Sequence, residues 1–136
     1  MVDTQNYSRE RERLKKASLR PTRQRLALVR LLFGAGNRHA TPEQLYEEAK
    51  QAGIQVSLAT IYNTLNHFTS AGLLRQVTLA QGKTFFDTNT GLHHHFYDET
   101  SQQLIDLPAE ALHLEHLPQA PEGKSITSVD VVVRIR

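Results

Sequence analysis

The chain has 136 residues, of which 39% are hydrophobic and 22% charged, and this composition is typical of a soluble globular protein. No apolar run approaches the roughly 18 residues of a membrane span, and the first residues lack the apolar core of a signal peptide. We therefore expect a cytoplasmic protein without a membrane partner. Because the chain contains no cysteine, any bound metal must be held by nitrogen and oxygen atoms.

The charges are distributed unevenly along the chain. Residues 1–87 carry 13 Lys and Arg against 7 Asp and Glu, whereas residues 88–136 carry 3 against 7. The net charges of the two parts are therefore +6 and −4. Ordinary solvated charge explains part of this difference, but a basic half beside an acidic half also indicates contact with phosphate on one side only.

Three helices are predicted in the first part of the chain. The first covers residues 7–17, and the second begins at Pro21. A Thr cap, a Pro at the first helical position and a Gln at the third form a capping box at residues 41–44, and Gly53 ends this third helix. The apolar spacing of the second helix predicts a buried side made of Leu26, Val29, Leu32 and Phe33.

A fourth helix and a hairpin follow. Ser57 can cap a helix over residues 57–71, and Gly72 can end it. Strands at residues 74–78 and 83–87 surround a turn at 80–82. Such an order is typical of a winged helix-turn-helix whose last helix reads a major groove, although a surface helix with a hairpin remains the simpler alternative. The predicted buried stripe of the helix is Leu58, Ile61, Leu65 and Phe68, and its other face is polar without any acid.

The last part of the chain has a different pattern. After a link at residues 88–92 we expect strands at 93–98 and 103–107, a helix at 109–117 that buries Leu112 and Leu117, and a strand at 127–135. About 45 residues bury too little surface to be stable alone, so a homodimer is expected. The predicted fold class is α+β, with a winged-helix DNA-binding domain at 1–87, a hinge at 88–92 and a small α/β dimerisation and ligand-sensing domain at 93–136.

Three consecutive histidines mark a possible ligand site. On an extended strand His93 and His95 face one side, about 6.6 Å apart, and His94 faces the other. Asp87 and His39 could add a carboxylate and an imidazole. Such donors suit Zn, Fe, Mn or Co, while a polar edge strand without a ligand is the alternative.

Five stretches carry a resemblance to a known family: LKKASLRPTRQRLALVRLL, HATPEQLYEEA, SLATIYNTLNHFTSAGLL, GKTFFD and HHHF. With them the chain resembles the ferric uptake regulator (Fur) superfamily over nearly its whole length. Within the superfamily it is most similar to the iron response regulator group (Irr), which has an HHH motif and senses haem. The resemblance implies a dimeric transcription regulator, not an enzyme, whose affinity for DNA depends on iron or haem.

The resemblance also implies ligand positions. The regulatory metal site of the superfamily falls on His39, Asp87, His93 and His95, with Asp in place of the usual Glu. The HHH motif implies haem binding by His93, His94 and His95. In the second metal site, Leu92 and Val129 replace ligands, so that only His94 and His113 are left. The structural zinc of many relatives is absent, since residues 98–101 replace its first C-x-x-C pair.

The DNA-binding residues are implied in the same way. The base-reading tyrosine of the superfamily falls on Tyr62, and the neighbouring arginine is replaced by Asn63, which could pair bidentately with adenine instead. Ser57 and Thr60 can contact phosphate and also cap the helix. The expected contacts to the DNA backbone or minor groove are Lys15, Lys16, Arg20 and Arg25.

Three functions therefore remain open. The first is a homodimeric regulator of promoter DNA that responds to iron or haem at the His-rich site. The second is a repressor of the same type that senses Zn, Mn or Fe without haem. The third is a small metal-dependent hydrolase that uses His93, His95 and Asp87. It ranks well below the other two, because the chain has no HExxH motif, no obvious general base and little room for a substrate pocket.

Overall fold

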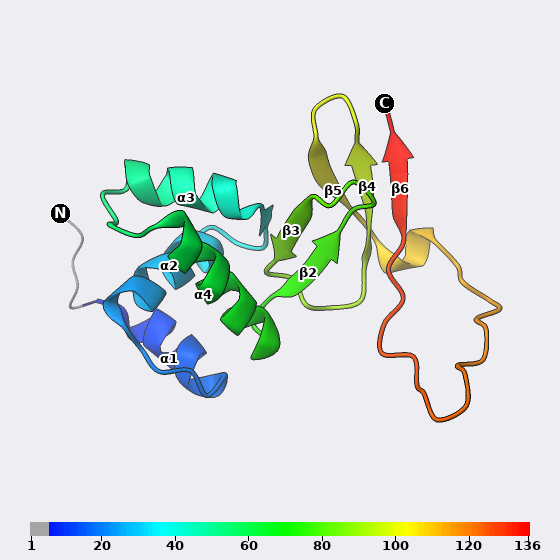
Figure 1. Ribbon diagram of the computed structural model, residues 1–136, viewed down its shortest axis with the longest axis horizontal. Coiled ribbons are helices and arrows are strands. Elements are labelled where there is room, and N and C mark those ends of the chain that lie inside the picture. Colours follow the sequence, from blue (N-terminus) through cyan, green and yellow to red (C-terminus); the bar gives the residue numbers. More distant parts are fainter. Residues whose placement is uncertain (1–5) are drawn as a thin grey trace. The chain divides into compact units, whose positions relative to one another are not determined.

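The computed structural model describes residues 6–136, so the first five residues of the predicted DNA-binding domain lie outside the described part (Figure 1). The chain divides into two units, one ending at Thr90 and the other covering Gly91–Arg136. Helices and a three-stranded sheet form the first unit, and a second three-stranded sheet dominates the other. The predicted α+β class is confirmed. Among the described residues, no helix has both the length and the apolar character needed to cross a bilayer.

The first two helices lie close to their predicted positions. α1 covers Ser8–Lys16, as expected, and α2 covers Arg23–Phe33. The predicted start of α2 at Pro21 is wrong by two residues. The reason is the cap, because the Thr22 hydroxyl accepts the Arg25 backbone N–H at 3.2 Å and so places Pro21 outside the helix.

The next two helices begin at the predicted caps. α3 (Pro42–Gln51) has the complete capping box, in which the Gln44 N–H donates to the Thr41 hydroxyl at 3.1 Å and the Thr41 N–H donates to the Gln44 side chain at 2.9 Å. α4 (Leu58–Ser70) begins after Ser57, whose hydroxyl accepts the Thr60 N–H at 3.1 Å. Both helix starts are therefore stabilised by local hydrogen bonds.

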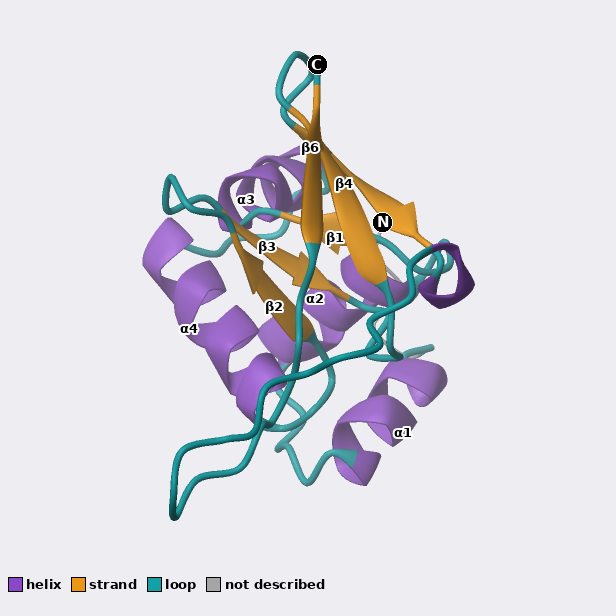
Figure 2. Cartoon of the chain, turned by 90° about the vertical axis from the view of Figure 1, so that its right-hand side faces the viewer, coloured by secondary structure: helices purple, strands orange, loops and turns teal. Residues whose placement is uncertain are grey.

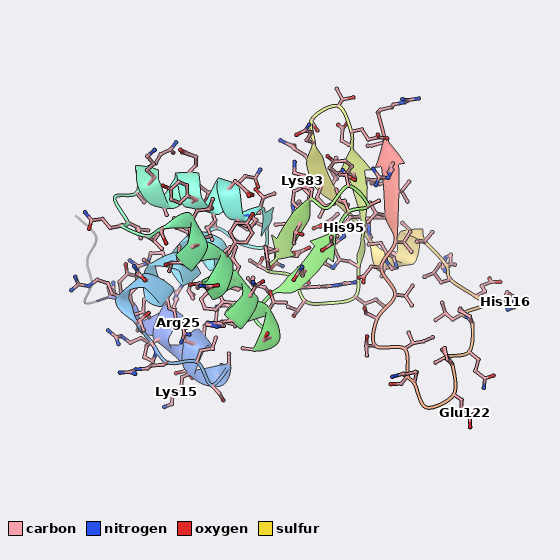
Figure 3. All side chains as sticks on the ribbon, in the orientation of Figure 1. Lys15, Arg25, Lys83, His95, His116 and Glu122 are labelled. Carbon is pink, nitrogen blue, oxygen red and sulfur yellow. The ribbon has the colours of Figure 1, made fainter. Side chains whose placement is uncertain are left out.

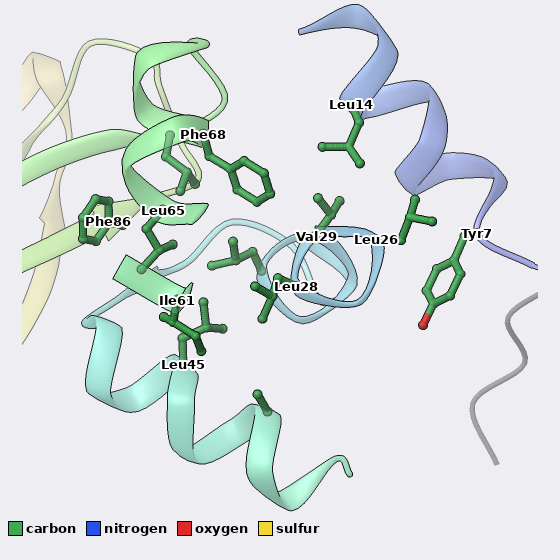
Figure 4. Packing of buried hydrophobic residues seen from close by; sticks show 13 residues of the cluster. Tyr7, Leu14, Leu26, Leu28, Val29, Leu45, Ile61, Leu65, Phe68 and Phe86 are labelled. Carbon is green, nitrogen blue, oxygen red and sulfur yellow. The ribbon is translucent and has the colours of Figure 1, made fainter. Parts of the chain in front are cut away.

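All four helices contribute to one apolar core in the first unit (Figure 4). The side chains of α4 in this core are Ile61, Leu65 and Phe68, which are fully buried. Leu58 differs from the prediction, because it is 36% exposed and the buried stripe starts one turn later. The core holds α4 with Tyr62, Asn63, Asn66 and His67 exposed at the surface, while Thr64 is buried. The residues of α1, α2 and α3 labelled beside it in Figure 4 are Leu14, Leu26, Leu28, Val29 and Leu45.

The wing of the first unit is a small antiparallel sheet with the strand order β1-β3-β2. β2 (Arg75–Thr78) and β3 (Thr84–Asp87) form the predicted hairpin. β1 (His39–Ala40) was not predicted, since two residues are too short to show an alternating pattern. Its pairing places His39 directly opposite Asp87.

The second unit contains the sheet β5-β4-β6. β4 (His94–Asp98) pairs with β5 (Gln103–Leu107) in antiparallel fashion and with β6 (Val132–Ile135) in parallel fashion. Figure 2 shows β6 beside β4. The hairpin was predicted within one residue at each end.

Two predictions for this unit are wrong. The helix expected at 109–117 is only a 3-10 turn at Ala109–Ala111, and the strand expected from residue 127 begins at Val132. Leu117, expected to be buried, is 53% exposed. A short helix is marginal in water without apolar packing. Leu112, also expected to be buried, is half-buried and Leu114 is 45% exposed, so that this segment has too little apolar packing to hold a longer helix.

Candidate functional site

Three potential metal ligands converge in the second unit. His93 precedes β4 and His95 lies on it, and their rings meet with centroids 4.5 Å apart. Both residues are buried. Asp106 is the partner of His95 in the β4–β5 register. The alternation of an extended strand and the pairing of one hairpin thus bring two imidazoles and a carboxylate together.

The distances in this cluster suit a metal ion. The Asp106 Oδ1 atom lies 3.5 Å from Nε2 of His93 and 3.6 Å from Nε2 of His95. These separations are long for N–H···O hydrogen bonds. Two donors that bind one ion at about 2.1 Å lie roughly 3.0–3.5 Å apart, in octahedral or tetrahedral geometry. The cluster therefore needs little movement to bind a divalent cation.

The hydrogen bonding of His93 prepares its ring for a metal. Its Nδ1 atom lies 2.8 Å from the Gly91 carbonyl oxygen, which can only accept, so the proton of the neutral ring is on Nδ1. The lone pair is then on Nε2, the atom that faces Asp106. A backbone carbonyl in this position is a common second-sphere partner of metal-binding histidines.

Asp106 was not among the residues predicted from the sequence, although a signal for it existed. The two strands and the four-residue turn of this hairpin were predicted nearly correctly, and residue numbers across such a hairpin have a constant sum. Counting back from the turn places Asp106 opposite His95, as the structure has it. An acid in register with a histidine was therefore available as an indication of a third ligand.

The other two predicted ligands belong to the first unit. His39 on β1 and Asp87 on β3 are paired in register. Asp87 is 1% exposed, and its Oδ1 atom accepts the Asn89 backbone N–H at 2.9 Å. The rings of His39 and Phe85 are nearly perpendicular, and their centroids are 6.3 Å apart. The wing thus places a carboxylate and an imidazole on neighbouring strands, and their role as ligands stays a prediction.

His94 lies apart from the cluster of His93, His95 and Asp106. Its Nδ1 atom accepts the Val131 backbone N–H at 3.3 Å, which ties the start of β4 to the chain just before β6. Beside it is a pocket of about 400 Å³. The apolar side chains around this pocket include Leu92, Leu112, Leu114, Leu117 and Ile126.

His94 and His113, the predicted remainder of a second metal site, have different surroundings, and their role as a pair of ligands stays a prediction. His113 is exposed in the segment where the expected helix does not form, and it does not line the pocket beside His94. The structure therefore divides the predicted haem residues into a pair that faces Asp106 and a single histidine beside an apolar pocket.

The exposed face of α4 has the properties of a DNA-reading surface. Tyr62 is 39% exposed, and Asn63 is exposed beside it. The Tyr62 hydroxyl donates to the Glu43 carboxylate of α3 at 2.5 Å, and this hydrogen bond raises the pKa of the Tyr62 phenol. Ser57 and Thr60 serve the helix cap, since the Ser57 hydroxyl also donates to that of Thr60 at 2.9 Å.

The predicted cations of the first unit have two different environments. Lys15, Lys16 and Arg20 are exposed and available to phosphate. Arg25 is half-buried, and it donates to the Arg20 carbonyl at 2.9 Å and to Nδ1 of His67 on α4 at 3.3 Å. Arg25 therefore ties the α1–α2 link to α4. Figure 3 labels Lys15 on α1 and Arg25 on α2.

A winged helix with an exposed polar face on α4, in a chain that also brings nitrogen and oxygen donors of potential metal ligands together, is typical of a metal-responsive transcription regulator. Comparison with known proteins identifies the family. The model of the ferric uptake regulator family matches residues 16–134, and the chain belongs to this family. Its members are DNA-binding dimers that regulate transcription and not enzymes, which confirms the prediction against a hydrolase.

Three relatives illustrate the match. The peroxide-responsive repressor PerR of Staphylococcus epidermidis is 31% identical over 122 residues, which are 87% of this chain and 75% of that protein. The ferric uptake regulation protein of Shigella flexneri is 39% identical over 82 residues, which are 60% of this chain and 55% of that protein. The structure of the ferric uptake regulator from Pseudomonas aeruginosa with manganese has a TM-score of 0.70 and 27% identity, and the match covers 93% of this chain and 96% of that one.

Proposed function

We propose that this chain is a homodimeric transcription regulator whose affinity for promoter DNA is set by a divalent ion held by His93, His95 and Asp106. The observation that carries the proposal is the convergence of three donor atoms within 4.8 Å of one another on one hairpin. Iron, manganese and zinc all accept imidazole and carboxylate ligands. The names of two relatives, a ferric uptake regulation protein and a ferric uptake regulator solved with manganese, agree with an iron- or manganese-type ion.

Three donors leave coordination positions for further ligands, because iron and manganese sites usually have more than three. The sequence-based prediction assigns Asp87 and His39 to these positions. Their pairing on β3 and β1 supports the assignment, since both side chains are presented by one small sheet. Substituting Asp87 tests whether it belongs to the same site.

Regulation by such an ion requires differential binding. A ligand shifts an equilibrium only by the difference between its affinities for the two states. In a dimer, the two DNA-binding domains must adopt the spacing of two DNA half-sites. The ion favours this arrangement if its protein ligands converge better there than in any other. The ion would then favour the DNA-binding arrangement and act as a co-repressor.

Measuring DNA affinity as a function of metal tests this proposal. A duplex selected from a random pool by the metal-loaded protein serves as operator, and binding is followed by fluorescence anisotropy. We expect chelation with EDTA to weaken operator binding at least tenfold, and Mn²⁺, Fe²⁺ or Zn²⁺ to restore it. Mg²⁺ is the control, since it prefers oxygen ligands. Equal affinity with and without these ions would overturn the proposal.

Haem is the second candidate ligand, and the apolar pocket beside His94 favours it. This is the form of the proposal that the resemblance to the Irr group implies. One condition follows from the hydrogen bonding. Because Nδ1 of His94 accepts the Val131 N–H, the neutral ring carries its proton on Nε2, and binding of iron by Nδ1 requires that this bond open.

Absorption spectra separate the two candidates. If haem binds at the pocket, the wild-type protein titrated with haem gives a saturable Soret band, and His94→Ala abolishes it. Combined substitution of His93 and His95 by alanine then leaves the band but removes the response to divalent ions. His113→Ala is the matched control, because His113 is an exposed histidine of the same unit that does not line the pocket. If wild type gives no saturable band, haem is excluded and the ion remains.

A further inference from the structure

We propose that Glu43 determines the specificity of DNA binding by holding the hydroxyl proton of Tyr62, so that Tyr62 meets base edges with its ring and an acceptor oxygen but without a donor. Glu43 is a positioning residue in this scheme, since it acts through Tyr62. The inference rests on the proposed function, because it requires that α4 enter the major groove.

The contact between the two residues joins two helices. Tyr62 lies on α4, and Glu43 is in the first turn of α3. The distance of 2.5 Å from the phenolic oxygen to the carboxylate oxygen is at the short end of the range for a charge-assisted O–H···O⁻ bond. Because Tyr62 is 39% exposed, this bond restrains a ring that solvent would otherwise leave mobile. The raised pKa of the Tyr62 phenol agrees with a hydroxyl that keeps its proton.

The carboxylate of Glu43 is held on a rigid support. α3 begins with a complete capping box between Thr41 and Gln44, which surrounds Glu43 in the sequence. An ionised carboxylate in the first helical turn is also favoured by the helix dipole. Glu43 is therefore placed to remain charged and fixed while the recognition helix meets DNA.

The hydrogen bond changes what Tyr62 can recognise. A neutral phenol has a single donor, and here that donor is given to Glu43. The remaining lone pairs accept, so the matching groups in a major groove are the amino groups of adenine and cytosine, and the ring can pack on a thymine methyl. Phosphate oxygens only accept hydrogen bonds. While Glu43 holds its proton, Tyr62 can therefore contact bases but cannot donate to the DNA backbone.

The charge of Glu43 has a separate effect, which does not depend on the DNA sequence. The exposed face of α4 carries no acid of its own, so Glu43 supplies negative charge to this face from the neighbouring helix. A carboxylate near phosphates weakens binding to any sequence. The charge alone therefore weakens binding to operator and scrambled duplex alike, and the ratio between the two affinities depends on the hydrogen bond to Tyr62.

A double-mutant cycle tests the inference on the full-length, metal-loaded protein. The variants are Glu43→Ala, Glu43→Gln, Tyr62→Phe and the combination of Glu43→Ala with Tyr62→Phe. Glu47→Ala is the matched control, since Glu47 is an exposed acid on the same helix, 4.0 Å from the Lys50 ammonium. For each variant the Kd is measured for the selected operator and for a scrambled duplex at one salt concentration, and circular dichroism verifies that the fold is kept.

We expect Glu43→Ala to lower the ratio of operator to scrambled affinity about tenfold, since a hydrogen bond to a charged group is lost. Glu43→Gln, which keeps an acceptor, should retain operator affinity within about threefold. Glu47→Ala should strengthen both duplexes alike and leave the ratio unchanged. In the Tyr62→Phe background, Glu43→Ala should not change the ratio further, because the hydroxyl on which it acts is gone.

Two results would overturn the inference, and both leave the proposed function intact. One is an equal effect of Glu43→Ala on the ratio with and without the Tyr62 hydroxyl, which would assign its effect to charge alone. The other is a Glu43→Ala protein that keeps the wild-type ratio of operator to scrambled affinity, although Tyr62→Ala removes the preference for the operator. Failure of the wild-type protein itself to distinguish operator from scrambled duplex would overturn the proposed function and this inference together.

Discussion

Replacing Asp106 with alanine is expected to abolish the metal response of DNA binding. The substitution removes the only charged donor of the three-ligand cluster in the second unit and leaves two neutral imidazoles. Loss of even a second-sphere partner of a metal ligand costs 10–100-fold in affinity, so we expect a loss of about 100-fold or more for this carboxylate. Competition with a fluorescent chelator gives the Mn²⁺ affinity, and anisotropy with operator DNA gives the response.

The fold should survive this change, because the Asp106 side chain is 54% exposed and buries little surface. Asp130→Ala is the matched control, since Asp130 is an exposed aspartate of the same unit, and one of its contacts is a hydrogen bond from the Ser128 hydroxyl at 3.3 Å. It should leave metal affinity and DNA binding unchanged. An Asp106→Ala protein that still responds to Mn²⁺ like the wild type would place the sensor elsewhere.

Asp87→Ala, measured in the same way, decides whether the wing contributes a ligand. A loss of metal affinity comparable with that of Asp106→Ala would assign Asp87 to the same ion. If the affinity is unchanged, the site is confined to the histidines and the aspartate of the β4–β5 hairpin.

Replacing Tyr62 with alanine is expected to remove specific DNA binding while the protein remains folded. Tyr62 is exposed on α4, outside the core made by Ile61, Leu65 and Phe68. One contact to a base edge contributes about 1–3 kcal/mol of discrimination, so affinity for the operator should fall roughly 10- to 100-fold. Affinity for a scrambled duplex should change less than about threefold, since phosphate contacts are kept.

Lys15→Ala provides the contrasting control for Tyr62→Ala. Lys15 is an exposed cation, and its loss should weaken operator and scrambled duplex alike and reduce the salt slope by about one. Anisotropy titrations at several salt concentrations measure both effects. If Tyr62→Ala kept full discrimination between the duplexes, α4 would not be the recognition helix.

Local features of the sequence were sufficient for most of the first unit. The Thr41–Gln44 capping box and the Ser57 cap predicted the starts of α3 and α4, because cap hydrogen bonds join residues two or three positions apart. The wing hairpin and the β4–β5 hairpin followed from alternation around short turns. The shared direction of His93 and His95 followed from the strand period alone.

Only the tertiary structure decided which distant side chains meet. The pairing of His39 with Asp87 depends on a two-residue strand that has no periodicity of its own, and the contact of Glu43 with Tyr62 depends on how α3 packs on α4. At residues 109–117 the sequence predicted an element that the structure does not contain. The residues there are good helix formers, but they have too little apolar packing, and only a 3-10 turn forms. The physical reason is common to these cases. Periodicity and caps describe interactions within one helix or strand. Strand register, helix packing and the orientation of a side chain are determined by the other elements that this helix or strand contacts.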